Sequence, residues 1–299
     1  MRQQASLRRN AGLSLIELMV SMVIGLFLIG GLVNVYISTK GTDSIRTEVT
    51  AMEESARIAL ASIRQIVSHA GYPSMRNLHL DAPFYAETDD IPNPDCRGGS
   101  ETLVSSSASS INILNKKTEQ IGGSTGAKRD AVVVISIADS PNEPLAGQIL
   151  KDCMEGEIPL ACSSDEDDGM YTPADAKLYS YLHISTADGG RALRCKGSRG
   201  GTQPLAENIE NMQFLYGVIN NDGSYQYRNA EAITANSQWG LVVSVQAAIL
   251  VRSEKEVLEK SESKVFVLLD EEITIAADKR LYRVYTTSIV LPNRAFREL

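Results

Sequence analysis

One carboxylate stands in an unusual place among the residues able to do chemistry. Glu17 lies at the start of an apolar run that continues from Leu18 to Ile37. A carboxylate in a membrane-spanning segment is costly, by roughly 2.5–3.5 kcal/mol at mid-membrane and less near an interface. It gains most from a cationic partner that is also poorly hydrated, such as an ammonium group. An ionisable side chain in such a place is a functional hypothesis by default.

The other candidates for catalysis or metal binding do not form a set. His69, His79 and His183 are scattered and lack the spacing of a zinc site. The sequence has no motif typical of a serine hydrolase, a zinc protease, a P-loop enzyme or a dinucleotide-binding fold. The acidic cluster Ser163–Gly169 lacks the alternating acids of an EF-hand, which favours a solvated turn. We expect no catalytic residue, no metal site and no cofactor.

Four cysteines are present: Cys96, Cys153, Cys162 and Cys195. An even number after a translocated segment indicates two disulfides formed in an oxidising compartment. Cys153 and Cys162 bracket a short loop. We therefore expect the pairs Cys153–Cys162 and Cys96–Cys195, although sequence alone allows three connectivities.

The overall charge argues against general binding of nucleic acid. The formal net charge is −8, with 29 basic and 37 acidic residues. Loss of Arg2, Arg8 and Arg9 with a leader would bring it to −11, because three of the 29 basic residues go. Such a surface repels the phosphate backbone.

The N-terminal 72 residues divide into three segments. Residues 1–12 carry three arginines and no acid, and residues 13–40 hold an apolar run long enough to span about 30 Å of hydrocarbon. The basic flank predicts that the N-terminus stays in the cytoplasm. In residues 41–72, apolar side chains recur at steps of three or four and predict an amphipathic half of the same helix. These are Ile45, Val49, Met52, Ala56, Leu60, Ile63 and Val67.

The apolar run is not followed by a small-residue cleavage site, whereas Gly12 precedes it. This arrangement resembles the leader of type IV pilin-like proteins, in which Gly12, Leu13 and Glu17 match the family spacing. The resemblance implies that prepilin peptidase cuts between Gly12 and Leu13 and that Leu13 is N-methylated. It also implies that Glu17 faces the Leu13 amine of a neighbouring subunit. Asn34 departs from the family, because many major pilins carry proline there.

Residues 73–299 predict a β-rich head with a loop-rich insertion at about 77–176. Hairpin turns between apolar, β-branched segments favour an antiparallel sheet on which the amphipathic half of the helix packs. The fold class expected is α+β. The expected strands are Ala131–Ile137, Lys177–Ile184, Ala192–Lys196, Ile209–Ile219, Tyr225–Arg228, Leu241–Arg252, Lys264–Leu269 and Leu281–Leu291, with a weak signal at Ser110–Leu114. Asp270–Lys279 is polar and favours a loop. We expect Trp239 and the strand tyrosines to pack within the sheet and not to form a binding face.

The C-terminal half narrows the resemblance to PilW-type minor pilins. The similar segments are Gln203–Gly217, the spacing to Trp239 and to Leu241–Ser253, and the closing Arg283–Arg294. This likeness implies a non-enzymatic subunit of the inner membrane with a periplasmic head, incorporated into the pilus. Its implied partners are prepilin peptidase, other minor pilins, the major pilin and the inner-membrane assembly platform. The expected role is in priming or at the tip, beneath an adhesin.

Two other classes of function remain open. A J-type minor pseudopilin of type II secretion shares the same general plan. A pilin whose head binds DNA or another ligand is the second alternative, and the acidic charge counts against DNA. A membrane-anchored enzyme is remote, because no convergent set of catalytic residues is present.

Overall fold

The computed structural model describes residues 14–72, 83–85, 118–122, 128–137, 151–155, 177–187, 190–197, 202–220 and 222–294. The chain divides into two compact units, Met1–Thr47 and Glu48–Leu299. The strand expected at Ser110–Leu114 and the turn expected at Ser163–Gly169 lie outside the described residues.

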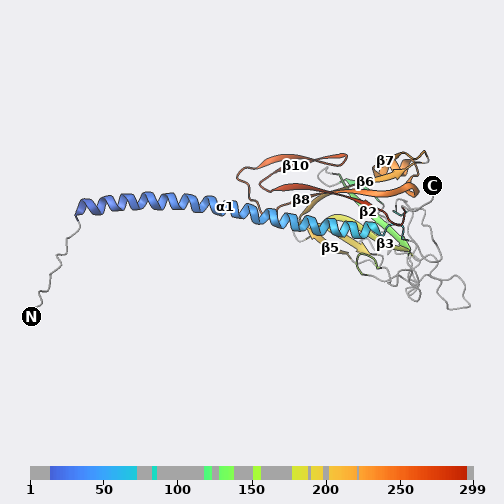
Figure 1. The fold of residues 1–299 in the computed structure, drawn as a ribbon, viewed down its shortest axis with the longest axis horizontal. Helices are drawn as coiled ribbons and strands as arrows, with labels where there is room; N and C mark the ends of the chain where they lie inside the picture. The colour runs from blue at the N-terminus through green and yellow to red at the C-terminus, as the bar shows by residue number, and fades with distance from the viewer. Residues whose placement is uncertain are drawn as a thin grey trace, which may run out of the picture. The chain divides into compact units, whose positions relative to one another are not determined.

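Helix α1 (Leu15–Ser68) contributes to both units and confirms the expected long N-terminal helix (Figure 1). In the second unit its buried face comprises Glu48, Met52, Ala56, Ala59, Ile63 and Val67. The predicted stripe is close to this face, but Ile45 is 37% exposed and Ala59 is buried. Gly71 ends the helical segment with φ +70°, and its N–H donates to the Ile135 carbonyl at 2.8 Å. Glycine adopts this left-handed conformation without steric cost.

The first sheet has five antiparallel strands in chain order. They are β1 (Glu119–Gly122), β2 (Lys128–Ile137), β3 (Lys177–Ala187), β4 (Gly190–Gly197) and β5 (Thr202–Glu207). The strands expected at 131–137, 177–184 and 192–196 are confirmed as β2, β3 and β4. Strands β1 and β5 were not expected, because each is short and carries few β-branched residues.

The second sheet has four antiparallel strands in the order β11-β8-β6-β7. They are β6 (Ile209–Ile219), β7 (Tyr225–Arg228), β8 (Val242–Arg252) and β11 (Tyr282–Val290), all at expected positions. A short helix α2 (Ala230–Ala235) and a 3-10 turn, η4 (Trp239–Leu241), connect β7 to β8.

The main core lies between the two sheets and includes the buried face of α1. Strand β8 is covered on both faces, which explains its nearly continuous apolar sequence. Its side chains Val245 and Ile249 belong to the main core, whereas Ala248 and Leu250 contact a smaller second cluster.

A two-stranded hairpin builds that second cluster and corrects one prediction. Strands β9 (Glu262–Leu268) and β10 (Glu271–Asp278) pair antiparallel, and Leu268 and Ile273 pack on the second sheet. The expectation that Asp270–Lys279 is a loop is therefore wrong. Only one face of β10 is apolar, so its strand signal is weak, and the turn uses Leu269 at φ +55° in place of a glycine.

Aromatic side chains join the two sheets at one end of the main core. Phe84, Tyr216 and Trp239 contact one another with ring centroids 4.9–5.8 Å apart. The Trp239 indole also donates to Thr234 Oγ1 at 3.0 Å. The fold is α+β, with a long N-terminal helix and antiparallel sheets, as the sequence predicted.

Candidate functional site

The beginning of α1 carries the carboxylate that the sequence singled out. Gly12 and Leu13 lie outside the described residues. Ser14 and Glu17 contact each other reciprocally: the Ser14 N–H donates to Glu17 Oε2, and the Glu17 N–H donates to Ser14 Oγ, both at 3.4 Å. This is a capping box, which satisfies free N–H groups in the first helical turn. The Glu17 side chain is exposed, so its carboxylate is accessible to a partner.

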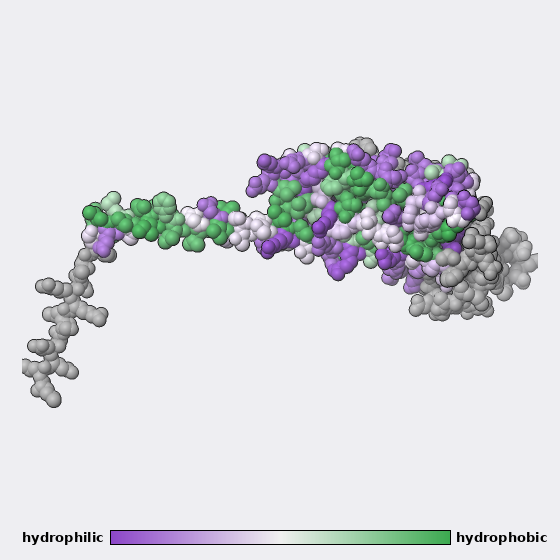
Figure 2. Space-filling view, turned by 45° about the horizontal axis from the view of Figure 1, so that its top comes forward, coloured by the Kyte–Doolittle hydropathy of each residue, from purple (hydrophilic) through white to green (hydrophobic). Residues whose placement is uncertain are grey.

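The stretch that follows is apolar over its whole circumference. One 18-residue window of α1 has a mean hydropathy of 2.4 and none of its residues is buried. Figure 2 shows apolar side chains over most of this half of the helix. Phe27, the most exposed of the large apolar side chains, is 81% accessible. An exposed apolar surface of this extent marks a contact with lipid or protein. By length and composition, the helix is able to cross a membrane.

Polar contacts fix the second half of α1 within its unit. Glu48 is only 4% exposed, and its Oε2 accepts the Lys255 N–H at 3.1 Å. Further along the helix, Glu53 pairs with Arg283 of β11 at 2.8 Å. Because a buried carboxylate without a donor is costly, the contact from Lys255 defines where the helix meets the segment after β8.

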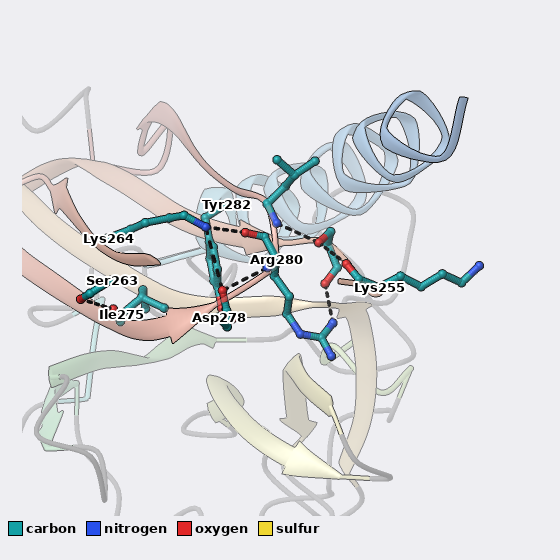
Figure 3. Close-up of polar contacts among 9 residues, drawn as sticks. Lys255, Ser263, Lys264, Ile275, Asp278, Arg280 and Tyr282 are labelled. Atoms are coloured by element: carbon teal, nitrogen blue, oxygen red, sulfur yellow. Dashed lines mark hydrogen bonds and ion pairs between the residues drawn. The ribbon is translucent and has the colours of Figure 1, made fainter. Parts of the chain in front are cut away.

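The segment that presents Lys255 is itself held by a hydrogen-bond network (Figure 3). Ser253 Oγ donates to the Lys255 carbonyl at 2.7 Å and accepts the Leu281 N–H at 2.9 Å. The Arg280 guanidinium donates to the Ser253 carbonyl at 2.8 Å, and Lys264 Nζ donates to the Arg280 carbonyl at 2.6 Å. Helix α1 is thus anchored to a hydrogen-bonded segment at the base of the β9–β10 hairpin.

Asp278 and Tyr282 complete the network. The Tyr282 hydroxyl donates to Asp278 Oδ2 at 2.6 Å, and Lys264 lies 3.9 Å from the other carboxylate oxygen. Burial and the hydrogen bond to Asp278 raise the pKa of Tyr282 well above its usual range. The hydroxyl therefore stays protonated and acts as a donor.

The disulfide connectivity differs from the expectation. Cys153 is bonded to Cys195, with 6.2 Å between the two Cα atoms, so the pairs Cys153–Cys162 and Cys96–Cys195 are wrong. The Cys153 N–H donates to Ser180 Oγ at 3.2 Å, and the Cys153 carbonyl accepts from Gln203 Nε2 at 3.1 Å. These contacts to β3 and β5 place Cys153 over the intervening strand β4, which carries Cys195.

Cys96 and Cys162 lie outside the described residues. The wrong pairing came from proximity in sequence, whereas the observed pair is 42 residues apart. No short-range signal marks Cys195 as the partner, because sheet register brings it to Cys153.

The histidines do not converge where the structure describes them. His69 follows α1, and burial lowers its pKa. His183 lies on β3 and stacks on Tyr181 with a centroid distance of 4.5 Å. His79 lies outside the described residues. Among the described residues no group of three or more histidine, cysteine and acidic side chains is placed to hold a metal ion.

Sequence reasoning did not single out Asp130, a buried carboxylate that contacts both sheets. Asp130 on β2 accepts the Phe214 N–H at 2.6 Å, linking the two sheets. Burial raises its pKa to about 7, with further contributions from Asp270, Glu271 and Glu231, while the hydrogen bond from Phe214 opposes the rise. An aspartate at the start of an apolar strand resembles a solvated turn residue, so only the sheet-to-sheet contact reveals it.

Comparisons with known proteins match both ends of the chain. Residues 181–293 match the family described as Type IV Pilus-assembly protein W. Residues 7–33 match the prokaryotic N-terminal methylation motif. No curated protein sequence is significantly similar.

A solved structure, the type IV-like pilin TTHA1219 from Thermus thermophilus, shares 12% sequence identity with this chain. The match covers 56% of this chain and 78% of that one, with a TM-score of 0.27. At that score we draw nothing from it about the fold. The two sequence matches contain the residues that first suggested the assignment, Gly12 and Glu17 at one end and the strands β6, β8 and β11 at the other.

Proposed function

Because the chain belongs to the PilW-type minor pilins of the type IV pilin-like superfamily, we propose that it primes pilus assembly from a complex with other minor pilins. The observation that carries the proposal is that one chain matches both the methylation motif and the PilW family. Proteins of this family are structural subunits, so the work proposed is assembly by packing, not catalysis.

Processing is the first step that we propose. Prepilin peptidase cuts between Gly12 and Leu13, and the new amino group of Leu13 is methylated. The methylation motif spans both residues. The cut removes Arg2, Arg8 and Arg9 and keeps the apolar helix, which then anchors the head at the periplasmic side of the inner membrane.

Docking through Glu17 is the second step. The Glu17 carboxylate pairs with the Leu13 amine of a neighbouring subunit within an apolar surrounding. Within the described residues the Glu17 carboxylate accepts one long hydrogen bond, from the Ser14 N–H at 3.4 Å, which is weak enough to exchange for an ammonium. Pairing removes the cost of an isolated charge in lipid, so it favours subunits in register.

The size of the head supports the proposed priming or tip position. The second compact unit extends from Glu48 to Leu299, which is bulky for a subunit that repeats along a shaft. A low-abundance subunit, contacting other minor pilins and the assembly platform, carries such bulk once per filament. An adhesin above it is compatible with the same position.

Mass spectrometry of the native N-terminus tests the proposal most directly. We expect a chain that begins with methylated Leu13 in cells with the peptidase, and an intact Met1 in cells without it. Gly12→Val should give only the uncut precursor, while Gly25→Val, a control inside the helix with open space around its Cβ position, should be cut normally. An intact N-terminus in peptidase-competent cells would refute processing.

Cell phenotypes separate the pilus from type II secretion. We expect deletion to abolish surface pili and twitching motility and to leave exoprotein secretion intact. The opposite pattern would assign the chain to the J-type pseudopilins. Counting subunits in sheared pili tests the position: a ratio of this chain to the major pilin that falls as filaments lengthen indicates a tip, and a constant ratio excludes it.

A further inference from the structure

A cavity of about 120 Å³ lies in the head between β4 and the end of β5. We call it the arginine pocket, and it is lined by Gly190, Arg191, Ala192, Arg194, Pro204, Glu207 and Asn208. A water molecule occupies about 30 Å³ in the liquid, so the pocket has room for roughly four waters. Ligand pockets for drug-sized molecules are several times larger, about 300–1,000 Å³. A pocket of this volume fits a small ion or the terminal polar group of one side chain.

The backbone that forms the pocket is fixed by one residue in the left-handed region. Asn208 has φ +62° and carries the chain from β5 in the first sheet to β6 in the second. Its carbonyl accepts the Arg252 N–H at 3.0 Å. Gly190 lies against the Arg252 guanidinium, since a Cβ built there would be 3.7 Å from Arg252 Nη2. A third arginine therefore stands directly behind the pocket lining.

The charges around the pocket are unbalanced. Glu210, whose side chain is 8% exposed, forms ion pairs with Arg191 and with Arg252, the latter at 3.7 Å. Arg129 donates through Nε to the Glu210 carbonyl at 3.2 Å. Two guanidinium groups thus share one carboxylate, and a third contacts the main-chain carbonyl of the same residue. Burial, followed by repulsion from Arg129 and Arg252, lowers the pKa of Arg191.

Nearby carboxylates do not remove this excess. Glu207 lines the pocket and is exposed, and no ion pair to it is formed by the described residues. Asp278 acts on Arg252 at longer range, but Arg280 opposes it there, and Asp278 already contacts Lys264. Since the whole chain carries a formal charge of −8, a local cationic excess stands out against an acidic background.

Several guanidinium donors have no acceptor within the described part of the chain. They are Arg129 Nη2, Arg194 Nε and Arg252 Nε, all buried. A buried donor without an acceptor is unfavourable, and more so when it is charged. Guanidinium groups bind carboxylate and phosphate in bidentate geometry, so an oxyanion is the ligand that relieves both the charge and the donors.

We propose that the arginine pocket binds an oxyanion group, a carboxylate or a phosphate, through Arg191, Arg194 and Arg252. The group comes either from an acidic side chain of a partner subunit or from free inorganic phosphate. The site is independent of the processing and docking proposed for the N-terminal helix.

Thermal unfolding of the full chain in non-ionic detergent tests this proposal. Trp239, the one tryptophan of the chain, is buried in the head and reports unfolding by fluorescence. Sodium phosphate and sodium acetate are titrated separately in the low millimolar range, with sodium chloride keeping the ionic strength constant. A ligand that binds only the folded state raises the midpoint in a saturable manner.

We expect a saturable rise with at least one of the two anions. A rise with phosphate alone identifies free phosphate as the source, and a rise with acetate identifies a protein carboxylate. If neither anion raises the midpoint above that in sodium chloride of the same ionic strength, the proposal is overturned.

Variants distinguish the pocket from general salt effects. Arg194→Gln is the main variant, because Arg194 lines the pocket without pairing to Glu210, and it should weaken anion affinity at least tenfold. Glu210→Gln should strengthen affinity severalfold, since it removes the competing carboxylate. Arg57→Gln on α1, whose side chain is 77% exposed and pairs with Glu54, is the matched control and should match wild type. Equal midpoint shifts in all four proteins would refute the site.

Discussion

The two halves of helix α1 have the same secondary structure and opposite environments. From Leu15 to Thr47 nearly every side chain is exposed, including the large apolar ones, whereas from Glu48 onward one face is buried in the main core. We call these stretches the bare half and the packed half. Helix propensity does not distinguish them, since both are continuous helix.

The difference lies in how apolar residues are distributed around the helix. The packed half has a stripe at Met52, Ala56, Ala59, Ile63 and Val67 that matches one protein surface. As far as Ile37 the bare half is apolar on all sides, so a single flank of the head could never cover it. Such a helix needs lipid or several other helices around it. The packed half therefore belongs to the stability of the head, and the bare half to its partners.

The largest predicted effect tests the packed half. Ile63 is fully buried, so Ile63→Ala should lower the free energy of unfolding of the head by about 4 kcal/mol, through lost burial and a new cavity. Ile58 on the same helix is 42% exposed, and Ile58→Ala should cost less than about 1 kcal/mol. Urea denaturation followed by Trp239 fluorescence measures both.

Equal losses in the two variants would contradict the assignment of the buried face. A small loss in both would mean that the helix contributes little to the head, and the contrast between the halves would fail.

The second effect is a pH dependence that belongs to the head. Asp130 has a folded-state pKa of about 7 against an ordinary value of 3.8, because burial disfavours its charge. The folded state binds the proton more tightly than the unfolded state, so Asp130 favours folding at low pH. Its contribution is full below the unfolded pKa, is lost as pH rises from about 4 to 7, and is flat above.

The loss amounts to on the order of 3–4 kcal/mol, from about three pKa units. In Asp130→Asn, which still offers an oxygen to the Phe214 N–H, this slope should vanish. The difference in unfolding free energy between variant and wild type should therefore rise by that amount between pH 4 and pH 8. A difference independent of pH would show that Asp130 titrates normally.

The third effect concerns the disulfide between Cys153 and Cys195. It closes a loop of 42 residues, and its removal in Cys195→Ala should cost about 3 kcal/mol by the chain-entropy model. Non-reducing peptide mapping should recover residues 153 and 195 in one linked fragment. Recovery of Cys153 linked to Cys162 would restore the expectation from sequence and contradict the sheet register.

Most helices and strands of the fold could be predicted from local sequence patterns. Apolar patterns and hairpin turns together located α1 and the strands β2, β3, β4, β6, β7, β8, β9 and β11 within a few residues. The prediction for strand β10 was wrong because its inward-facing residues, Ile273 and Ile275, stand between residues that are polar or exposed. A hairpin that covers another sheet shows only half an apolar pattern, and the covered sheet is not visible to local reasoning.

Contacts between distant parts of the chain could not be predicted for the same reason. Cys195 reaches Cys153 through sheet register, and Asp130 meets the Phe214 N–H across two sheets. Beside the arginine pocket, ion pairs join Arg191, Arg252 and Glu210 from three strands, and no spacing in the sequence relates them. In contrast, Gly12, Leu13 and Glu17 act within one short segment, so the family pattern could be recognised there directly.

The smallest predicted effect on the head comes from the bare half. Ile29 is 59% exposed, so Ile29→Ala should change the free energy of unfolding of the head by less than about 0.5 kcal/mol. Ile29→Asp should leave the head equally stable and yet weaken retention in the membrane fraction, because an aspartate near the middle of the span costs roughly 2.5–3.5 kcal/mol. Fractionation of cells and urea denaturation of the same protein measure the two effects separately. If either variant destabilised the head by more than about 1 kcal/mol, the bare half would be coupled to the core, and its apolar surface would no longer be available solely to lipid and to other subunits.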